Sequence, residues 1–118
     1  MPTVANFVSI RDANVTIPSS DTGGLNDIHL QDIDLPGLSR GPAILFYRLR
    51  PKGRCTLQVR INGTVLAKQN LDTSPALSFH EIFFSTELKE NGNELTVSVS
   101  GEGSVVVSDF VIFFQVAV

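Results

Sequence analysis

The chain has 118 residues, of which 42% are hydrophobic and 18% are charged. This length accommodates one domain of ordinary size, and the balance is too apolar for a disordered chain and too interrupted by polar residues for a membrane-spanning helix. The formal net charge of −3 argues against a uniformly basic nucleic-acid-binding protein. We therefore expect a single globular domain over residues 1–118, with neither a nucleic-acid nor a membrane partner.

The cysteine content and the first residues bear on the cellular compartment. Cys55 is the one cysteine of the sequence, so it cannot form a disulfide within the chain. Residues 1–6 contain neither the basic segment nor the apolar segment of a secretion signal. Both observations predict a reducing, cytoplasmic environment.

Apolar and polar residues alternate along most of the chain, which is typical of strands with one buried face. The alternation predicts strands over residues 4–10, 14–17, 28–35, 44–50, 55–61, 64–69, 79–84, 94–100 and 105–118. Asn62-Gly63 predicts a type I′ hairpin turn, because these two residue types tolerate positive φ. Short strands at this spacing predict an all-β fold, namely an antiparallel β-sandwich of jelly-roll topology with about eight strands.

The last predicted strand differs from the others because it is apolar on both faces. We expect a bulge at Ser108-Asp109 to reset the alternation between its two halves. A strand of this kind must be covered on both sides, either by loops of the same chain or by a second subunit. The second alternative predicts a homo-oligomer. Its interface would contain Phe110, Ile112, Phe113 and Phe114.

Three segments have an order of parts that is known from a protein family. They are Leu57-Gln58-Val59-Arg60-Ile61-Asn62-Gly63, Phe79-His80-Glu81-Ile82 and residues 88–99, which read LKENGNELTVSV. This order resembles the galactose-binding-like β-jelly-roll domains that occur as carbohydrate-binding modules and as accessory domains of glycoside hydrolases. The resemblance implies a jelly-roll fold and lectin-like carbohydrate binding without catalysis. Such modules usually stack sugars on exposed Trp or Tyr, whereas this chain has no Trp and one Tyr, Tyr47.

Charged and amide side chains are therefore the best candidates for ligand contacts. Residues 40–60 contain six basic residues and no acidic one, and Arg side chains suit carboxylates, sulfates and vicinal hydroxyls. The alternative is an ordinary solvated sheet face. The predicted ligand-binding residues are Arg48, Arg50, Gln58 and Arg60, with Asn26 and Asp27 from a neighbouring loop.

Residues 21–27 also contain oxygen donors suited to a hard cation. No cofactor is expected apart from calcium, for which Asp21 and Asp27 are the candidate ligands, and the resemblance implies a structural calcium near such a loop. The alternative is that these residues form Asx-turns. Asp27 and His29 would share a strand face, and Ser39 could approach them, but no G-x-S-x-G motif supports nucleophilic catalysis.

Two hypotheses of function follow from the sequence. The first is a non-catalytic, lectin-like module with a carbohydrate ligand. The second is a self-assembling scaffold protein that uses its apolar C-terminal strand as the subunit interface. Neither hypothesis requires an enzyme.

Overall fold

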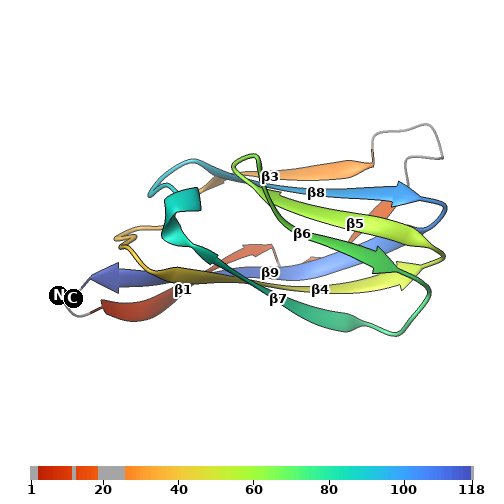
Figure 1. Cartoon of the computed structure of the whole chain (residues 1–118), viewed down its shortest axis with the longest axis horizontal. Helices are drawn as coiled ribbons and strands as arrows, with labels where there is room; N and C mark the ends of the chain where they lie inside the picture. Colours follow the sequence, from red (N-terminus) through yellow and green to blue (C-terminus); the bar gives the residue numbers. More distant parts are fainter. Residues whose placement is uncertain (1–2, 12, 19–25, 118) are drawn as a thin grey trace.

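A computed structural model describes residues 3–11, 13–18 and 26–117 of the chain (Figure 1). These residues contain one short 3₁₀ helix, η2 (Ser85–Glu87), and nine strands. The strands are β1 (Thr3–Arg11), β2 (Val15–Pro18), β3 (Asp27–Ile33), β4 (Pro42–Lys52), β5 (Cys55–Ile61), β6 (Thr64–Leu71), β7 (Leu77–Phe84), β8 (Asn93–Gly101) and β9 (Ser104–Ala117). Within the described residues, no helix is long and apolar enough to span a membrane.

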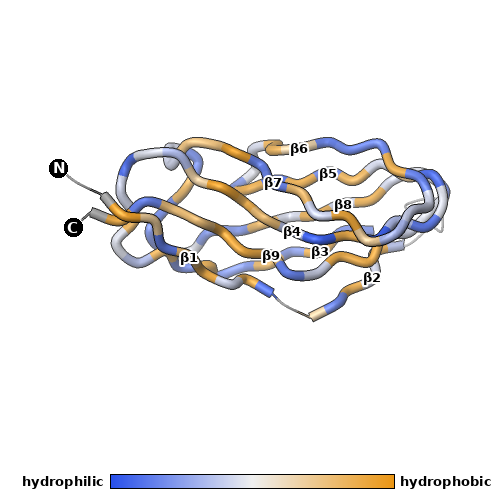
Figure 2. The backbone as a smooth tube through the Cα atoms, turned by 90° about the horizontal axis from the view of Figure 1, so that it is seen from below, coloured by the Kyte–Doolittle hydropathy of each residue, from blue (hydrophilic) through white to orange (hydrophobic). Residues whose placement is uncertain are grey.

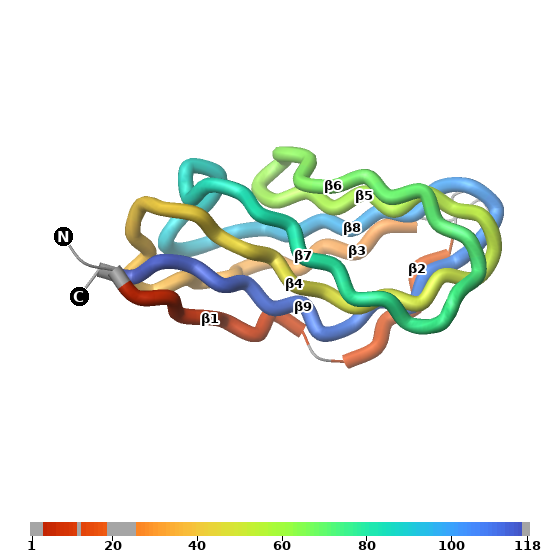
Figure 3. The backbone as a smooth tube through the Cα atoms, turned by 60° about the horizontal axis from the view of Figure 1, so that its bottom comes forward, coloured from red at the N-terminus to blue at the C-terminus, as the bar shows by residue number. Residues whose placement is uncertain are grey.

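The strands form two sheets that pack face to face (Figures 1 and 3). Sheet A has the order β1-β9-β4-β7, with β2 also paired to β9, and sheet B has the order β3-β8-β5-β6. The strand pairs of both sheets are antiparallel. Among the described strands, consecutive strands belong to the same sheet only for β1 and β2 and for β5 and β6, so elsewhere successive strands alternate between the two sheets. The predicted antiparallel β-sandwich is confirmed.

The core lies between the sheets and consists of alternate residues from each strand. In β5, every second side chain from Cys55 to Ile61 is buried, while the residues between them are half-buried. β4 and β8 bury their inner positions in the same way. Each fully buried Leu or Val contributes about 1.5–3 kcal/mol relative to an exposed one, so this alternation is what stabilises the two layers.

A bulge in β9 lets both halves of that strand contribute to the core. Asp109 has a φ of 57°, and the pairing with β4 shifts between Phe46 and Arg48. Val107 before the bulge and Phe110 after it are therefore both buried. The bulge expected at Ser108-Asp109 is confirmed.

The same bulge corrects the predicted subunit interface. Phe110, Ile112 and Phe114 are each 1% exposed and face the core, so they cannot contact another subunit in the folded protein. Phe113 points the other way and is 38% exposed. Because β9 is apolar in both phases, alternation alone could not tell the core side from the outer side.

The turn after β5 is locked to the start of β8 by two asparagines. Asn62 and Gly63 have φ values of 49° and 86°, as a type I′ turn requires. The Asn62 side-chain amide donates to Asn93 Oδ1 at 2.9 Å. Asn93 is fully buried and also donates to the carbonyl of Ile33 at 2.9 Å and that of Lys89 at 2.6 Å. This hydrogen-bond network explains why the sequence has an asparagine at position 62 and another at position 93.

A buried tyrosine packs within sheet A and hydrogen-bonds to Glu81, a residue of β7 that also contacts sheet B. The Tyr47 ring stacks between Phe79 and Phe110, with ring centroids 5.7 and 5.6 Å away. Its hydroxyl donates to Glu81 Oε1 at 3.2 Å, and the Gln69 amide of sheet B donates to the same oxygen at 3.5 Å. Burial, together with the nearby Glu81 carboxylate, raises the pKa of Tyr47 well above its ordinary value. Tyr47 is therefore a core residue and offers no ring to a ligand.

Candidate functional site on the outer face of sheet B

The outer face of sheet B carries a continuous set of polar side chains. The register aligns Asp27, Ser98 and Gln58 in one row across β3, β8 and β5. The next row contains His29, Thr96 and Arg60. We call this surface the polar face. It comprises Asp27, His29, Gln31, Gln58, Arg60, Glu94, Thr96 and Ser98.

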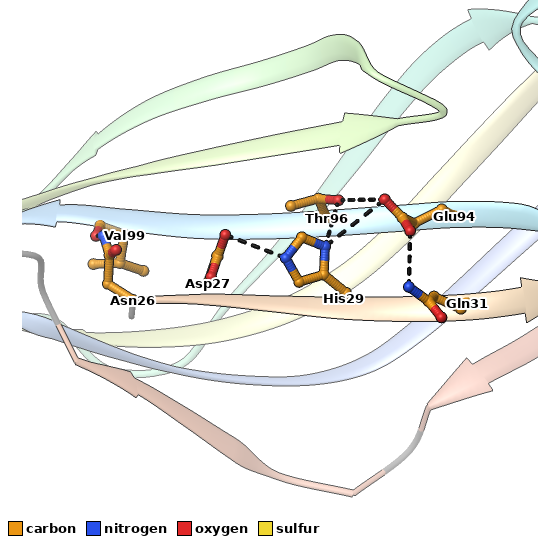
Figure 4. Close-up of polar contacts among 7 residues, drawn as sticks. All are labelled: Asn26, Asp27, His29, Gln31, Glu94, Thr96 and Val99. Carbon is orange, nitrogen blue, oxygen red and sulfur yellow. Dashed lines mark hydrogen bonds and ion pairs between the residues drawn. The ribbon is translucent and has the colours of Figure 1, made fainter. Parts of the chain in front are cut away.

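His29 lies at the centre of the hydrogen-bonded part of the polar face (Figure 4). Its Nε2 is 3.3 Å from Asp27 Oδ2, and its Nδ1 is 3.7 Å from Glu94 Oε1. Gln31 Nε2 donates to the second oxygen of Glu94 at 3.0 Å. The imidazole is thus held between two carboxylates, while 48% of its side chain remains exposed. This arrangement fixes the ring in place without covering it.

Thr96 and Arg60 follow His29 in the same row of the polar face. Thr96 is 6% exposed, and its hydroxyl lies 3.3 Å from His29 Nδ1 and 3.4 Å from Glu94 Oε1. Arg60 is the neighbour of Thr96 on β5. Its Nε is buried and has no hydrogen-bond partner among the described residues. A buried donor without a partner costs about 1–3 kcal/mol, and such atoms are rare in folded proteins.

The structure brings together four of the six predicted ligand-binding residues. Asp27, Gln58 and Arg60 belong to the polar face. Asn26 lies at its end, where its backbone carbonyl accepts from the Val99 amide at 2.9 Å and its side chain donates to the Val99 carbonyl. Asn26 therefore anchors the start of β3 to β8.

The other two predicted ligand-binding residues lie elsewhere. Arg48 and Arg50 are exposed on β4, on the outer face of sheet A. The turn after β4 carries the chain to the other sheet, so these two side chains point away from Gln58 and Arg60. One ligand cannot contact both groups across the sandwich.

The residues considered for calcium and for catalysis are only partly within the described part of the chain. Asp21 lies outside the described residues, and the Asp27 carboxylate pairs with His29. No group of three or more potential metal ligands occurs among the described residues. The Ser39 backbone amide donates to the carbonyl of Gln115 on β9, which belongs to sheet A, whereas His29 lies on sheet B. The hydroxyl that lies beside His29 is that of Thr96.

Sequence reasoning left His29, Gln31, Glu94 and Thr96 out of the ligand-binding set. The signal for Glu94 and Thr96 was present, since they alternate with the inward-facing Leu95 and Val97. What the sequence lacked was the pairing of β3 with β8, which joins residues sixty or more positions apart.

Comparison with known proteins adds information on the fold. The sequence matches no protein-family model and no curated protein. Its structure is similar to a part of dimeric latent PorU from Porphyromonas gingivalis, with a TM-score of 0.70 and 10% identity over 98% of this chain. This chain spans only 13% of the length of PorU.

Carbohydrate-binding modules are also among the similar structures. The CBM36-1 domain of a multidomain xylanase, from the hindgut metagenome of Trinervitermes trinervoides, has a TM-score of 0.57 and 9% identity over 98% of this chain and 100% of its own. A family 35 carbohydrate-binding module from Clostridium thermocellum has a TM-score of 0.57 and 12% identity over 95% and 99% of the two chains. The resemblance to carbohydrate-binding modules is confirmed at the level of the fold.

Proposed function

We propose that this protein is a non-catalytic carbohydrate-binding module and that its ligand contacts the polar face of sheet B. The observation that carries the proposal is the ordered group of Asp27, His29 and Glu94 beside Arg60, presented on an open sheet surface. The similarity in fold to carbohydrate-binding modules supports the same proposal, although a fold does not determine a function.

The residue types on the polar face match the chemistry of sugar hydroxyls, each of which donates one hydrogen bond and accepts others. The Asp27 and Glu94 carboxylates accept, the Arg60 guanidinium donates, and the amide of Gln58 does both. Because His29 and Gln31 already hold these carboxylates in position, binding costs less side-chain entropy than it would for free side chains. The half-exposed imidazole of His29 also offers a ring surface in a chain without Trp.

The geometry around His29 favours binding over catalysis. A nucleophilic hydroxyl must reach both a base and the substrate. Thr96 meets the first condition, since its hydroxyl is 3.3 Å from His29 Nδ1. It does not meet the second, because it is 6% exposed and lies beneath the neighbouring side chains.

Affinity electrophoresis in gels that contain soluble xylan, galactan, mannan or β-glucan tests the proposal. We expect at least one polysaccharide to retard the protein. The Arg60→Ala variant should lose about tenfold or more in affinity, because hydrogen bonds to a charged group contribute about 1.5–3 kcal/mol. Asp27→Ala should weaken the retardation as well.

Arg48→Ala is the matched control, since it removes an exposed Arg from the opposite outer face. It should leave the retardation unchanged. The proposal is wrong if none of the polysaccharides retards the protein, or if Arg48→Ala abolishes retardation while Arg60→Ala does not.

A further inference from the structure

The outer face of sheet A carries an exposed apolar surface that the proposed function does not use. The register places Phe7, Phe113, Ile44 and Ile82 in one row across β1, β9, β4 and β7. The Phe7 and Phe113 rings are in contact, with centroids 5.9 Å apart. We call this surface the apolar half of sheet A. It comprises Phe7, Ile44, Phe46, Ile82, Phe84, Val111 and Phe113.

The exposure of this surface is concentrated and not scattered. Among the described residues, seven large apolar side chains are exposed, and four of them belong to the apolar half. They are Ile82 at 74%, Phe84 at 68%, Phe7 at 60% and Phe113 at 38% exposed. Single exposed apolar residues are ordinary, but a contiguous patch marks an interaction surface.

The rest of the same face has a different character. Beyond the bulge of β9, the outer positions of β4 are the exposed Arg48, Arg50 and Lys52. Figure 2 views the molecule from this side, and the strands change from mostly orange near the chain termini to more blue beyond the middle. The outer face of sheet A is therefore divided into an apolar half and a basic half.

We propose that the apolar half binds the apolar half of a second copy of this chain, which gives a dimer with the two A sheets back to back. The division of the face favours this occupant. A two-fold axis that runs across the strands at the Phe113–Ile44 row superposes the two apolar halves. The same rotation carries the two basic halves to opposite ends, so the like charges stay apart. An acidic partner would instead be attracted to the basic half.

The exposed apolar area can form the centre of a dimer interface, and polar positions around it must supply the rest of the contact area. The four exposed side chains present on the order of 400 Å² of apolar surface, given that a whole aromatic side chain buries 150–250 Å². A stable interface needs about 800 Å² from each partner, with an apolar centre and a polar rim. Ser9 and Ser78, which are exposed on the same outer face, supply rim positions. Two sheet faces also pack well at about 10 Å, the spacing found inside a sandwich.

A back-to-back dimer would also affect ligand binding, and this step rests on the proposed function. In a back-to-back dimer, the two polar faces of sheet B point in opposite directions. Such a dimer would bridge two polysaccharide chains, because both of its sites cannot lie flat on one surface.

The molar mass in solution tests the proposal, by sedimentation of the full chain over a wide range of protein concentrations. We expect the natural protein to have twice the mass of one chain, and one chain has a mass of 12.8 kDa. The double variant Phe7→Ser/Ile82→Ser should sediment as a monomer with an unchanged circular dichroism spectrum, because both side chains are mostly exposed. Val65→Ser, which removes a 50% exposed apolar residue from sheet B, is the matched control and should remain a dimer.

The result separates this proposal from the carbohydrate-binding proposal. A natural protein that stays monomeric at all concentrations overturns the dimer, and so does a double variant that remains dimeric. If the double variant loses polysaccharide retardation and Arg60→Ala keeps it, the apolar half is a sugar-binding surface and the dimer proposal fails. Arg60→Ala should lose retardation and remain a dimer, which would leave the two surfaces independent.

Discussion

The two outer faces of this sandwich share a backbone geometry but differ in chemistry. On sheet B, the outward positions are polar and linked to one another through His29, Asp27 and Glu94. On the apolar half of sheet A, the equivalent positions are Phe and Ile side chains that remain exposed. The comparison shows that the inward positions of a strand determine the fold, whereas the outward positions are free to differ, and both proposed binding surfaces lie at outward positions.

The largest loss of stability is expected when a core-facing side chain of β9 is removed, and an outward-facing neighbour on the same strand gives the comparison. Phe114→Ala should lower the free energy of unfolding by about 3–5 kcal/mol, because it removes a ring that is 1% exposed in the core. Phe113→Ala, the adjacent residue on the outer side, should cost far less in the isolated monomer. Urea unfolding of the two variants, each in the Phe7→Ser/Ile82→Ser background, measures the difference. Equal losses would mean that the bulge at Asp109 does not set the phase of β9.

The next effect tests the network that positions sheet B. Asn93→Ala should cost about 2–4 kcal/mol, since it leaves the buried carbonyl of Ile33 and the part-buried carbonyl of Lys89 without the Asn93 donor. Asn91→Ala, two residues earlier and exposed, is the matched control and should cost little. Thermal unfolding of both variants measures the two losses. If Asn91→Ala were as destabilising as Asn93→Ala, the network would not be the reason for the motif.

A smaller effect concerns the hydrogen bond between Tyr47 and Glu81 inside sheet A. Tyr47→Phe should lower the free energy of unfolding by about 1 kcal/mol at neutral pH, through loss of the hydrogen bond to Glu81. The pKa of Tyr47 is raised in the folded state, so the folded state favours the protonated phenol. Its contribution is therefore present below the ordinary tyrosine pKa of about 10 and is lost as the pH rises above it.

Urea unfolding over a series of alkaline pH values checks the direction in which this contribution changes with pH. The natural protein should lose more stability above pH 10 than Tyr47→Phe does, since the variant has no phenol to ionise. A difference between the two proteins that does not change with pH would contradict the raised pKa.

The smallest effect on stability is expected on the polar face. His29→Ala should change the free energy of unfolding by less than about 1 kcal/mol, because its contacts with the Asp27 and Glu94 carboxylates are partly exposed to solvent. The same substitution should reduce polysaccharide retardation severalfold, since it frees both carboxylates. A large loss of stability would assign the cluster a structural role in place of a binding role.

The sequence was sufficient for the parts of the fold that depend on local pattern. Alternation predicted β5 and β8, Asn62-Gly63 predicted the hairpin, and Ser108-Asp109 predicted the bulge. It was not sufficient for facts that depend on distant pairing. Arg48 and Arg60 are close in sequence, but the turn between their strands places them on opposite faces of the molecule.

The candidate site was predicted in part for the same reason. Asp27, Gln58 and Arg60 are outward-facing by alternation, and the order of strands β3-β8-β5 brings them onto one face. Nothing local in the sequence indicates that His29 lies beside Glu94 and Thr96, because these contacts require β3 to pair with β8.

The most direct test of the central claim is a titration of the ¹⁵N-labelled protein with soluble oligosaccharides, followed through the backbone amide resonances. We expect chemical-shift changes to concentrate on β3, β5 and β8, with the largest changes near His29, Arg60 and Thr96. Changes concentrated on β1 and β7 of sheet A, or the absence of any change across the panel, would contradict it.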